Sequence, residues 1–473
     1  MCCRPPTRGI ELEQLSSRDA SFLQLEATHA PMQLGAVHLF DSGAATSAPD
    51  FEAFRDHLDQ RLQFWPRLRQ RIVEVPLNVA CPYWLDDPDF YLDHHLSRVT
   101  LNTPRNQQSL MTLAADVFSR PLDRRRALWS ITYVEGLSRL AGLGAGSFAL
   151  ITRVHQAMAS DLGIDDMLLR ITGSSPTHTP PPYRAWRPEP VPSDAQMLAK
   201  TYGKAFSNPV ELARLVARGA MVAAQVVREG TARRRDMPPH IYAAPPTRWN
   251  KAVTPARRMA VARVPLSSVC AIRKHAGEAQ INDVVAALCG GALRNLFASG
   301  GVLPEQPLVG LCPVLSRVDD KPAALPMLLP LATDVDDPAA RLKGISTAAA
   351  RSGLYRSAIA LQEISGRAPM TLAVEGIRLY TGLHLADRFR PIFNLVCLYM
   401  PSTGEPRYLM GARLKSRYFA LPLLDGQGLT VTASSCDDQM DLTVLACPDC
   451  VPGLDRWPAA IKQALRALTR AFA

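Results

Sequence analysis

The sequence lacks any apolar stretch long enough to cross a bilayer. A membrane-spanning helix needs about 18 or more consecutive apolar residues, and the best candidates, at 141–151 and 324–332, are much shorter. The first residues, MCCRPPTRG, also lack the apolar core of a secretory signal. We therefore expect a protein of the cytoplasm or of the cytoplasmic face of a membrane.

Regularly spaced cysteines are also missing, although the chain has ten cysteines in all. Most lie in apolar runs, as Cys289 and Cys397 do, so we expect reduced thiols within the core. One pair, Cys447 and Cys450, has the spacing of a redox or zinc site. Because no second such pair and no histidine cluster lies nearby, the spacing favours a loop with two thiols over a metal site.

No nucleic-acid-binding motif accompanies the net charge of +10, and the basic residues are dispersed along the chain. An anionic lipid surface or a polyanionic molecule such as coenzyme A would explain this charge equally well. The charge alone does not choose between these partners, but the missing motif argues against nucleic acid.

The chain is long enough for two domains. Its 473 residues, 47% of them hydrophobic and 20% charged, predict two globular domains of about 200 residues each. A proline-rich stretch at 174–193 interrupts the structural pattern, and a helical pattern at 208–227 follows it. We expect a first lobe over 1–173, a connection over 174–250 that holds this long helix, and a second lobe over 251–473. The helix is expected to pack against a domain, with a basic amphipathic membrane contact as the alternative.

Helix and strand patterns are mixed in both halves. Apolar residues recur at helical spacing in several segments, while others alternate or form short apolar runs typical of strands. The clearest helices are at 51–62, 279–297 and 454–472, and the clearest strands are at 34–41, 147–155 and 429–446, the last a hairpin turned at 436–439. The mixture predicts an α/β or α+β protein with two lobes of similar size.

The stretch ITRVHQAMASDLGIDDMLL has nearly the layout of a catalytic turn between a strand and a helix. His155 stands where the strand ends, and Asp161 follows six residues later. Gln156 comes directly after the histidine. A glutamine amide forms hydrogen bonds but accepts no proton at neutral pH, so the residue next to His155 is not a general base.

Four segments, taken together and in order, resemble the bacterial wax ester synthase/diacylglycerol acyltransferase family. They are LSSRDASFLQLEATHAPMQLG from residue 15, PLDRRRALW at 121–129, INDVVAALCGGALR at 281–294 and PLLDGQGLTVT at 422–432. The resemblance therefore covers essentially the whole chain. It implies an α/β fold of two chloramphenicol-acetyltransferase-like, coenzyme-A-dependent lobes with a channel between them.

The resemblance also implies the reaction. A fatty acyl group would pass from long-chain acyl-CoA, a co-substrate and not a bound cofactor, to the hydroxyl of diacylglycerol or of a long-chain alcohol. The products would be triacylglycerol or wax ester, made peripherally at the inner membrane or at a lipid droplet. No metal is implied.

The family motif is His-His-x-x-x-Asp-Gly, in which the second histidine is the base and the aspartate organises the turn. Gln156 stands at the position of that base here, and a one-residue insertion is needed to place Asp161 at the position of the aspartate. His155 is expected to be structural, with a base role after rearrangement as the alternative. His38 is expected to be a satisfied core or rim residue.

Four further residues match the family and are candidates for substrate binding. Asn282 and Asp283 belong to the helix at 279–297, where a cap and a favourable dipole contact would explain them equally well. Asp425 and Gly426 belong to a tight turn expected to border the channel.

Three functional hypotheses follow from this departure from the motif. The leading one is an O-acyltransferase that makes neutral lipid, impaired by the loss of the base. The alternative is an inactive paralogue that binds acyl-CoA or lipid and acts as partner or regulator of a related acyltransferase. In the third, the enzyme acts on an amine, which needs less base assistance than an alcohol.

Overall fold

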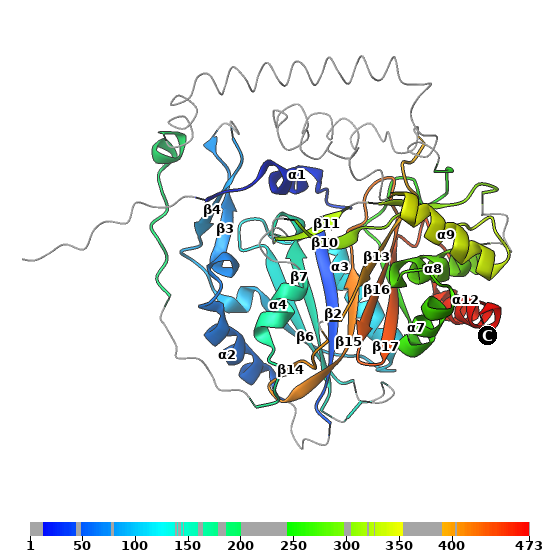
Figure 1. The fold of residues 1–473 in the computed structure, drawn as a ribbon. Helices are drawn as coiled ribbons and strands as arrows, with labels where there is room; N and C mark the ends of the chain where they lie inside the picture. Colours follow the sequence, from blue (N-terminus) through cyan, green and yellow to red (C-terminus); the bar gives the residue numbers. More distant parts are fainter. Residues whose placement is uncertain are drawn as a thin grey trace, which may run out of the picture.

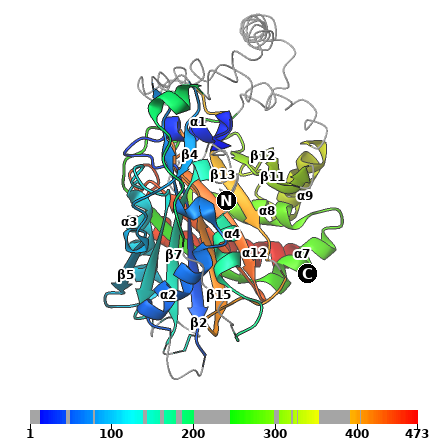
Figure 2. The ribbon, with the colours of Figure 1, turned by 90° about the vertical axis from the view of Figure 1, so that its left-hand side faces the viewer.

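The computed structural model presents two six-stranded sheets with helices packed on their outer faces (Figure 1 and Figure 2). No helix in the described part of the chain is long and apolar enough to cross a membrane. The structure describes residues 13–43, 49–76, 80–137, 140, 143–144, 146–158, 164–177, 186–199, 244–297, 304–318, 321–325, 327–352, 390–402 and 404–472.

The first sheet has the strand order β14–β15–β2–β7–β6–β5. Its strands are β2 (Gln33–Asp41), β5 (Leu96–Thr100), β6 (Trp129–Glu135), β7 (Phe148–His155), β14 (Tyr408–Leu409) and β15 (Ala412–Ala420). One face packs against α3, and the other packs against α2 and α4. The helices of this lobe are α1 (Ser17–Leu25), α2 (Phe51–Leu62), α3 (Gln107–Ser119) and α4 (Ile164–Ile171).

The second sheet has the strand order β12–β9–β13–β16–β17–β8. Its strands are β8 (Arg258–Pro265), β9 (Val309–Leu311), β12 (Leu328–Pro330), β13 (Leu395–Met400), β16 (Leu429–Cys436) and β17 (Gln439–Ala446). Its outer face carries α7 (Leu266–His275), α8 (Ile281–Phe297), α9 (Pro338–Ser352) and α12 (Trp457–Ala471), as Figure 1 shows on the right. β13 runs parallel to β9 and β16, whereas the other pairs are antiparallel.

Smaller elements complete the described chain. A three-stranded sheet of β1 (Glu13–Gln14), β4 (Tyr83–Asp86) and β3 (Gln70–Val73) stands beside α1 and α2. β10 (Val314–Val318) and β11 (Lys321–Leu325) form a separate hairpin. The 3₁₀ turns are η1 (Pro66–Arg69), η3 (Leu92–His94), η4 (Gln156–Met158) and η8 (Leu454–Arg456).

Local sequence signals account for many of these boundaries. The Ser16 hydroxyl accepts from the backbone N–H of Asp19 and so caps α1, and Asp50 caps α2 in the same way through Ala53. The predicted hairpin is confirmed, because Cys436 pairs with Gln439 across its turn. The mixed α/β class with two lobes is likewise confirmed.

One strand links the two lobes. β15 comes from the second half of the sequence, yet it pairs with β2 of the first sheet along most of its length. Its other face meets the second sheet, where the Thr432 hydroxyl donates to the carbonyl oxygen of Phe419. The first sheet therefore contains more than residues 1–173. The predicted lobe boundaries stay a prediction. The helix predicted at 208–227 lies outside the described residues.

Candidate active site

The motif residues occupy the turn that follows β7. The strand ends at His155 and passes directly into η4. The backbone N–H of Gln156 donates to the carbonyl oxygen of Met32 at 2.8 Å, which fixes the turn to the segment before β2. The side-chain oxygen of Gln156 is buried and finds no hydrogen-bond partner within the described residues. This oxygen is therefore available to accept a hydrogen bond from a hydroxyl group.

His155 is enclosed, with only 1% of its surface exposed. Its Nδ1 accepts from the backbone N–H of Ala157 at 3.0 Å, so the proton of the neutral ring sits on Nε2. Nε2 lies 3.5 Å from Oε1 of Glu26, which is close enough for attraction but long for a hydrogen bond. Because both nitrogens face groups of the protein, the geometry favours the expected structural role of His155.

Glu26 connects two of the segments that carry the family resemblance. Its Oε2 accepts from Nε of Arg124 at 2.8 Å, and its Oε1 accepts from the backbone N–H of Met32 at 3.1 Å. Burial works to raise the pKa of Glu26, but His155 and Arg124 together outweigh it and hold the pKa below its usual value. Glu26 is thus an ionised carboxylate that supports the motif turn.

Asp161 lies outside the described residues, so its position stays a prediction. Asp165, four residues farther along the sequence, lies in the first turn of α4. Its Oδ2 accepts from Nη1 of Arg417 at 2.8 Å, which ties α4 to β15. Burial raises the pKa of Asp165, and the charge of Arg417 offsets this only in part.

Asp283 holds the start of α8. Its Oδ2 accepts from the backbone N–H of Gln280 at 2.9 Å and from the Ser346 hydroxyl of α9 at 3.0 Å. The helix begins at Ile281, so the expectation that Asn282 is its cap is wrong. Instead, the carboxylate of Asp283 accepts from the backbone N–H of Gln280, which directly precedes the helix. The acidic residue of a capping box makes the same contact.

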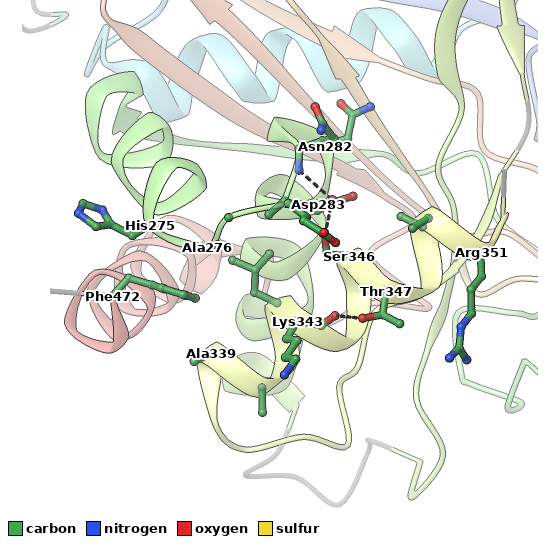
Figure 3. A pocket seen from close by; sticks show the side chains of 18 of the residues that line it. His275, Ala276, Asn282, Asp283, Ala339, Lys343, Ser346, Thr347, Arg351 and Phe472 are labelled. Atoms are coloured by element: carbon green, nitrogen blue, oxygen red, sulfur yellow. Dashed lines mark hydrogen bonds between the residues drawn. The ribbon is translucent and has the colours of Figure 1, made fainter.

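Asn282 and Asp283 border a cavity of about 1080 Å³ (Figure 3). Its walls come from α9, from the loop between α7 and α8 and from Phe472 near the end of the chain. A cavity of this size is large enough for a long ligand. Asn282 also lines a much smaller second cavity, which Cys397 and Tyr399 border from β13. Asn282 therefore stands in the wall between the two spaces.

Asp425 and Gly426 shape a turn between β15 and β16. Gly426 has a φ of +86°, a conformation that favours glycine, and its N–H donates to the carbonyl oxygen of Lys251. The Asp425 carboxylate accepts from the backbone N–H of Val253 at 3.0 Å. Its Oδ2 also lies 3.1 Å from Nε2 of His29, which belongs to the first lobe. The turn thus joins the lobes.

His29 is a residue that sequence reasoning missed. It lies 396 positions from Asp425, and no local pattern marks the pair; only their membership in two of the family-like segments could have drawn attention to them. His38 differs from its expectation in another way. It is fully buried as predicted, but neither ring nitrogen has a partner within the described chain, so it is not a satisfied core residue.

No group of three or more histidine, cysteine or acidic side chains forms a metal site in the described ranges. Cys447 and Cys450 are buried free thiols in a turn where the N–H of Cys450 donates to the carbonyl oxygen of Cys447. These two residues therefore belong to the loop that leads to η8.

Comparisons with known proteins agree with this architecture along the whole chain. Residues 15–285 match the wax ester synthase/diacylglycerol acyltransferase catalytic domain, and residues 325–469 match the WS/DGAT C-terminal domain. The chain belongs to the wax ester synthase/diacylglycerol acyltransferase family. It is therefore an enzyme of the diacylglycerol O-acyltransferase/wax ester synthase type.

Individual relatives extend over nearly the full length. A Mycobacterium tuberculosis protein provisionally named a diacylglycerol O-acyltransferase is 30% identical over 472 residues, covering 97% of this chain and 99% of the relative. A second, from the same species, is 28% identical over 470 residues, covering 96% of this chain and 90% of the relative.

Solved structures show the same fold. A wax ester synthase/diacylglycerol acyltransferase from Marinobacter aquaeolei VT8 superimposes with a TM-score of 0.68 at 26% identity, covering 96% of this chain and 98% of that one. A starter condensation domain of rhizomide synthetase gives a TM-score of 0.55 at 12% identity, covering 98% and 94%. The latter likeness concerns the fold alone and fits the predicted two-lobed acyltransferase architecture.

Proposed function

We propose that this enzyme transfers a fatty acyl group from long-chain acyl-CoA to the hydroxyl of diacylglycerol or of a long-chain alcohol. The observation that carries the proposal is the match of both lobes, in order, to the two domains of one acyltransferase family. The products are triacylglycerol or wax ester. Since these acceptors reside in lipid phases, the enzyme works at a membrane or lipid-droplet surface.

The motif turn supports a division of labour around the reacting hydroxyl. The side-chain oxygen of Gln156, buried and without a hydrogen-bond partner among the described residues, accepts a hydrogen bond from the acceptor alcohol and holds it for attack. The amide cannot take the proton, so Gln156 supplies orientation and not base catalysis. His155 supports the turn, and the proposal gives Asp161 the same role. We expect turnover slower than that of an enzyme with a histidine at position 156.

The other predicted substrate-binding residues divide by their contacts. Asn282 borders both cavities, so we assign it to the wall that the acyl chain or its thioester contacts. Asp283 is already bonded to Gln280 and Ser346. Asp425 and Gly426 likewise have their hydrogen bonds within the protein. These three residues therefore act by fixing the walls of the site.

The first test is the release of CoA from a long-chain acyl-CoA by the purified protein. Diacylglycerol dispersed in vesicles, a long-chain alcohol and a long-chain amine serve as separate acceptors. We expect CoA release coupled to ester formation with at least one of the two hydroxyl acceptors. Turnover with the amine alone would assign the enzyme to amide formation. Acyl-CoA binding without turnover on any acceptor would identify a lipid-binding paralogue and sink the proposal.

A further inference from the structure

A histidine–carboxylate pair bridges the two lobes beside the motif turn. Nε2 of His29 lies 3.1 Å from Oδ2 of Asp425 and 3.2 Å from its Oδ1. The Asp425 side chain is only 5% exposed, whereas that of His29 is 34% exposed. Because an ionised carboxylate only accepts hydrogen bonds, the proton of the neutral ring sits on Nε2 and Nδ1 carries the lone pair.

The loop that carries His29 is tied to the motif on both sides. Before it, Glu26 faces Nε2 of His155 at 3.5 Å. After it, the carbonyl oxygen of Met32 accepts from the N–H of Gln156 at 2.8 Å. His29 lies midway between these two attachments, and its own carbonyl oxygen accepts from Nη2 of Arg257 in the second lobe at 2.7 Å. The ring is thus held at the lobe junction next to the end of β7.

We propose that His29 is the general base of this enzyme, with Asp425 as its positioning residue, in place of the histidine missing at position 156. This inference rests on the proposed acyl transfer. Asp425 fixes the orientation of the ring, which is the role that a carboxylate takes beside a catalytic histidine. Nδ1 is then the ring nitrogen that takes the proton.

The step balances without any further reactant. The acceptor oxygen bonds to the thioester carbonyl carbon while its proton passes to Nδ1 of His29. The tetrahedral intermediate collapses, the carbon–sulfur bond breaks, and the imidazolium returns the proton to the leaving thiolate of CoA. The ester and free CoA leave, and His29 is neutral again. Gln156 holds the attacking hydroxyl but carries no proton.

Two other described histidines, His155 and His38, do not fit this role. His155 is sealed at 1% exposure with Nδ1 occupied by Ala157. His38 is fully buried in the middle of β2, about five strand residues from the level of the motif turn, since it pairs with Leu150 while Gln33 pairs with His155. His29 combines a buried carboxylate partner with a partly exposed ring.

The deciding variant is His29→Gln. A glutamine amide nitrogen reaches about as far as Nε2 and can donate to Asp425, so the lobe bridge is kept while the proton acceptor is lost. We expect kcat/KM to fall by about 10²-fold or more, the usual contribution of general-base catalysis. His94→Gln, at an exposed histidine, is the matched control and should leave kcat/KM unchanged.

A double variant separates catalysis from folding. Gln156→His supplies a base at the position usual for the family, so His29→Gln/Gln156→His should recover most of the activity lost in His29→Gln. Wild-type rates in His29→Gln, or a loss that the double variant does not recover, overturn the assignment even if the wild type is active. An inactive wild type would instead defeat the proposed function itself.

Discussion

Two histidine–carboxylate pairs flank the end of β7, and they differ in what surrounds the ring. In the His155–Glu26 pair both side chains are almost fully buried, at 1% and 7% exposure. In the His29–Asp425 pair only the carboxylate is buried, and the ring is one-third exposed. The first pair lies within one lobe, whereas the second crosses from one lobe to the other.

The comparison shows that a histidine beside a carboxylate is not by itself a catalytic group. Nδ1 of His155 accepts a hydrogen bond from the N–H of Ala157, and Nε2 points toward Glu26. Both nitrogens therefore hold the turn. Within the described residues, the hydrogen bonds of the His29 ring are made through Nε2. The predictions below test this difference, beginning with the largest expected effect.

Gln156→His should produce the largest change, because it places a histidine directly after His155, at the position of the base in the family motif. If the turn held by His155 and Glu26 is intact, the new imidazole can act as a base, and in the His29→Gln background, which lacks the proposed base, kcat/KM should rise by about 10²-fold or more. The measurement is CoA release with saturating diacylglycerol, and Gln156→Asn is the matched control that adds no base. An unchanged rate in Gln156→His would show that the motif turn is no longer aligned with the acceptor.

Glu26→Ala should break the enclosed pair and act on stability. It removes the acceptor of Arg124 and of the Met32 N–H and leaves Nε2 of His155 facing a void. Lost hydrogen bonds to a charged, buried group predict a decrease of about 3 kcal/mol in the free energy of unfolding. Urea denaturation measures it.

Glu26→Gln is the control for this prediction, because it keeps the shape and one acceptor oxygen and should lose about half as much. If Glu26→Ala unfolds at the same urea concentration as the wild type, Glu26 does not support the turn, and the contrast between the two pairs is lost.

Local signals made much of the fold predictable. The helix predicted at 51–62 is α2 with the same ends, because Asp50 caps it and its apolar residues recur at helical spacing. The hairpin at 436–439 was equally accessible, since both strands and their turn are contiguous. β15 was not assigned to the first sheet, because its partner β2 is hundreds of residues away and strand propensity does not specify the partner.

The site was less predictable for the same reason. His155 and Gln156 were found because a contiguous motif marks them. The expectation for Asn282 failed because the helix begins one residue earlier, at Ile281, so Asn282 lies inside its first turn. His29 and Asp425 become a pair only after the lobes meet, so neither spacing nor composition indicates their contact.

His38 gives the smallest predicted effect and sharpens the comparison, because its ring nitrogens have no hydrogen-bond partner among the described residues. Burial, followed by the nearby charge of Arg417, lowers its pKa to about 3. An unfolded chain binds a proton at this ring near pH 6.5, whereas the folded protein does not. His38 therefore contributes stability above pH 6.5 that is lost as the pH falls toward 3.

His38→Leu should remove this dependence. At pH 5 the wild type should have lost about 2 kcal/mol of unfolding free energy through this residue relative to pH 7, at about 1.4 kcal/mol per pH unit below 6.5. The variant should lose less by that amount, and at neutral pH it should be as stable as the wild type or more so, since the ring nitrogens are buried without partners. Urea denaturation of both proteins at the two pH values measures the difference. If the wild type and the variant lose the same unfolding free energy on acidification, His38 is hydrogen-bonded in solution. It would then resemble His155 and would not be a buried histidine without a partner.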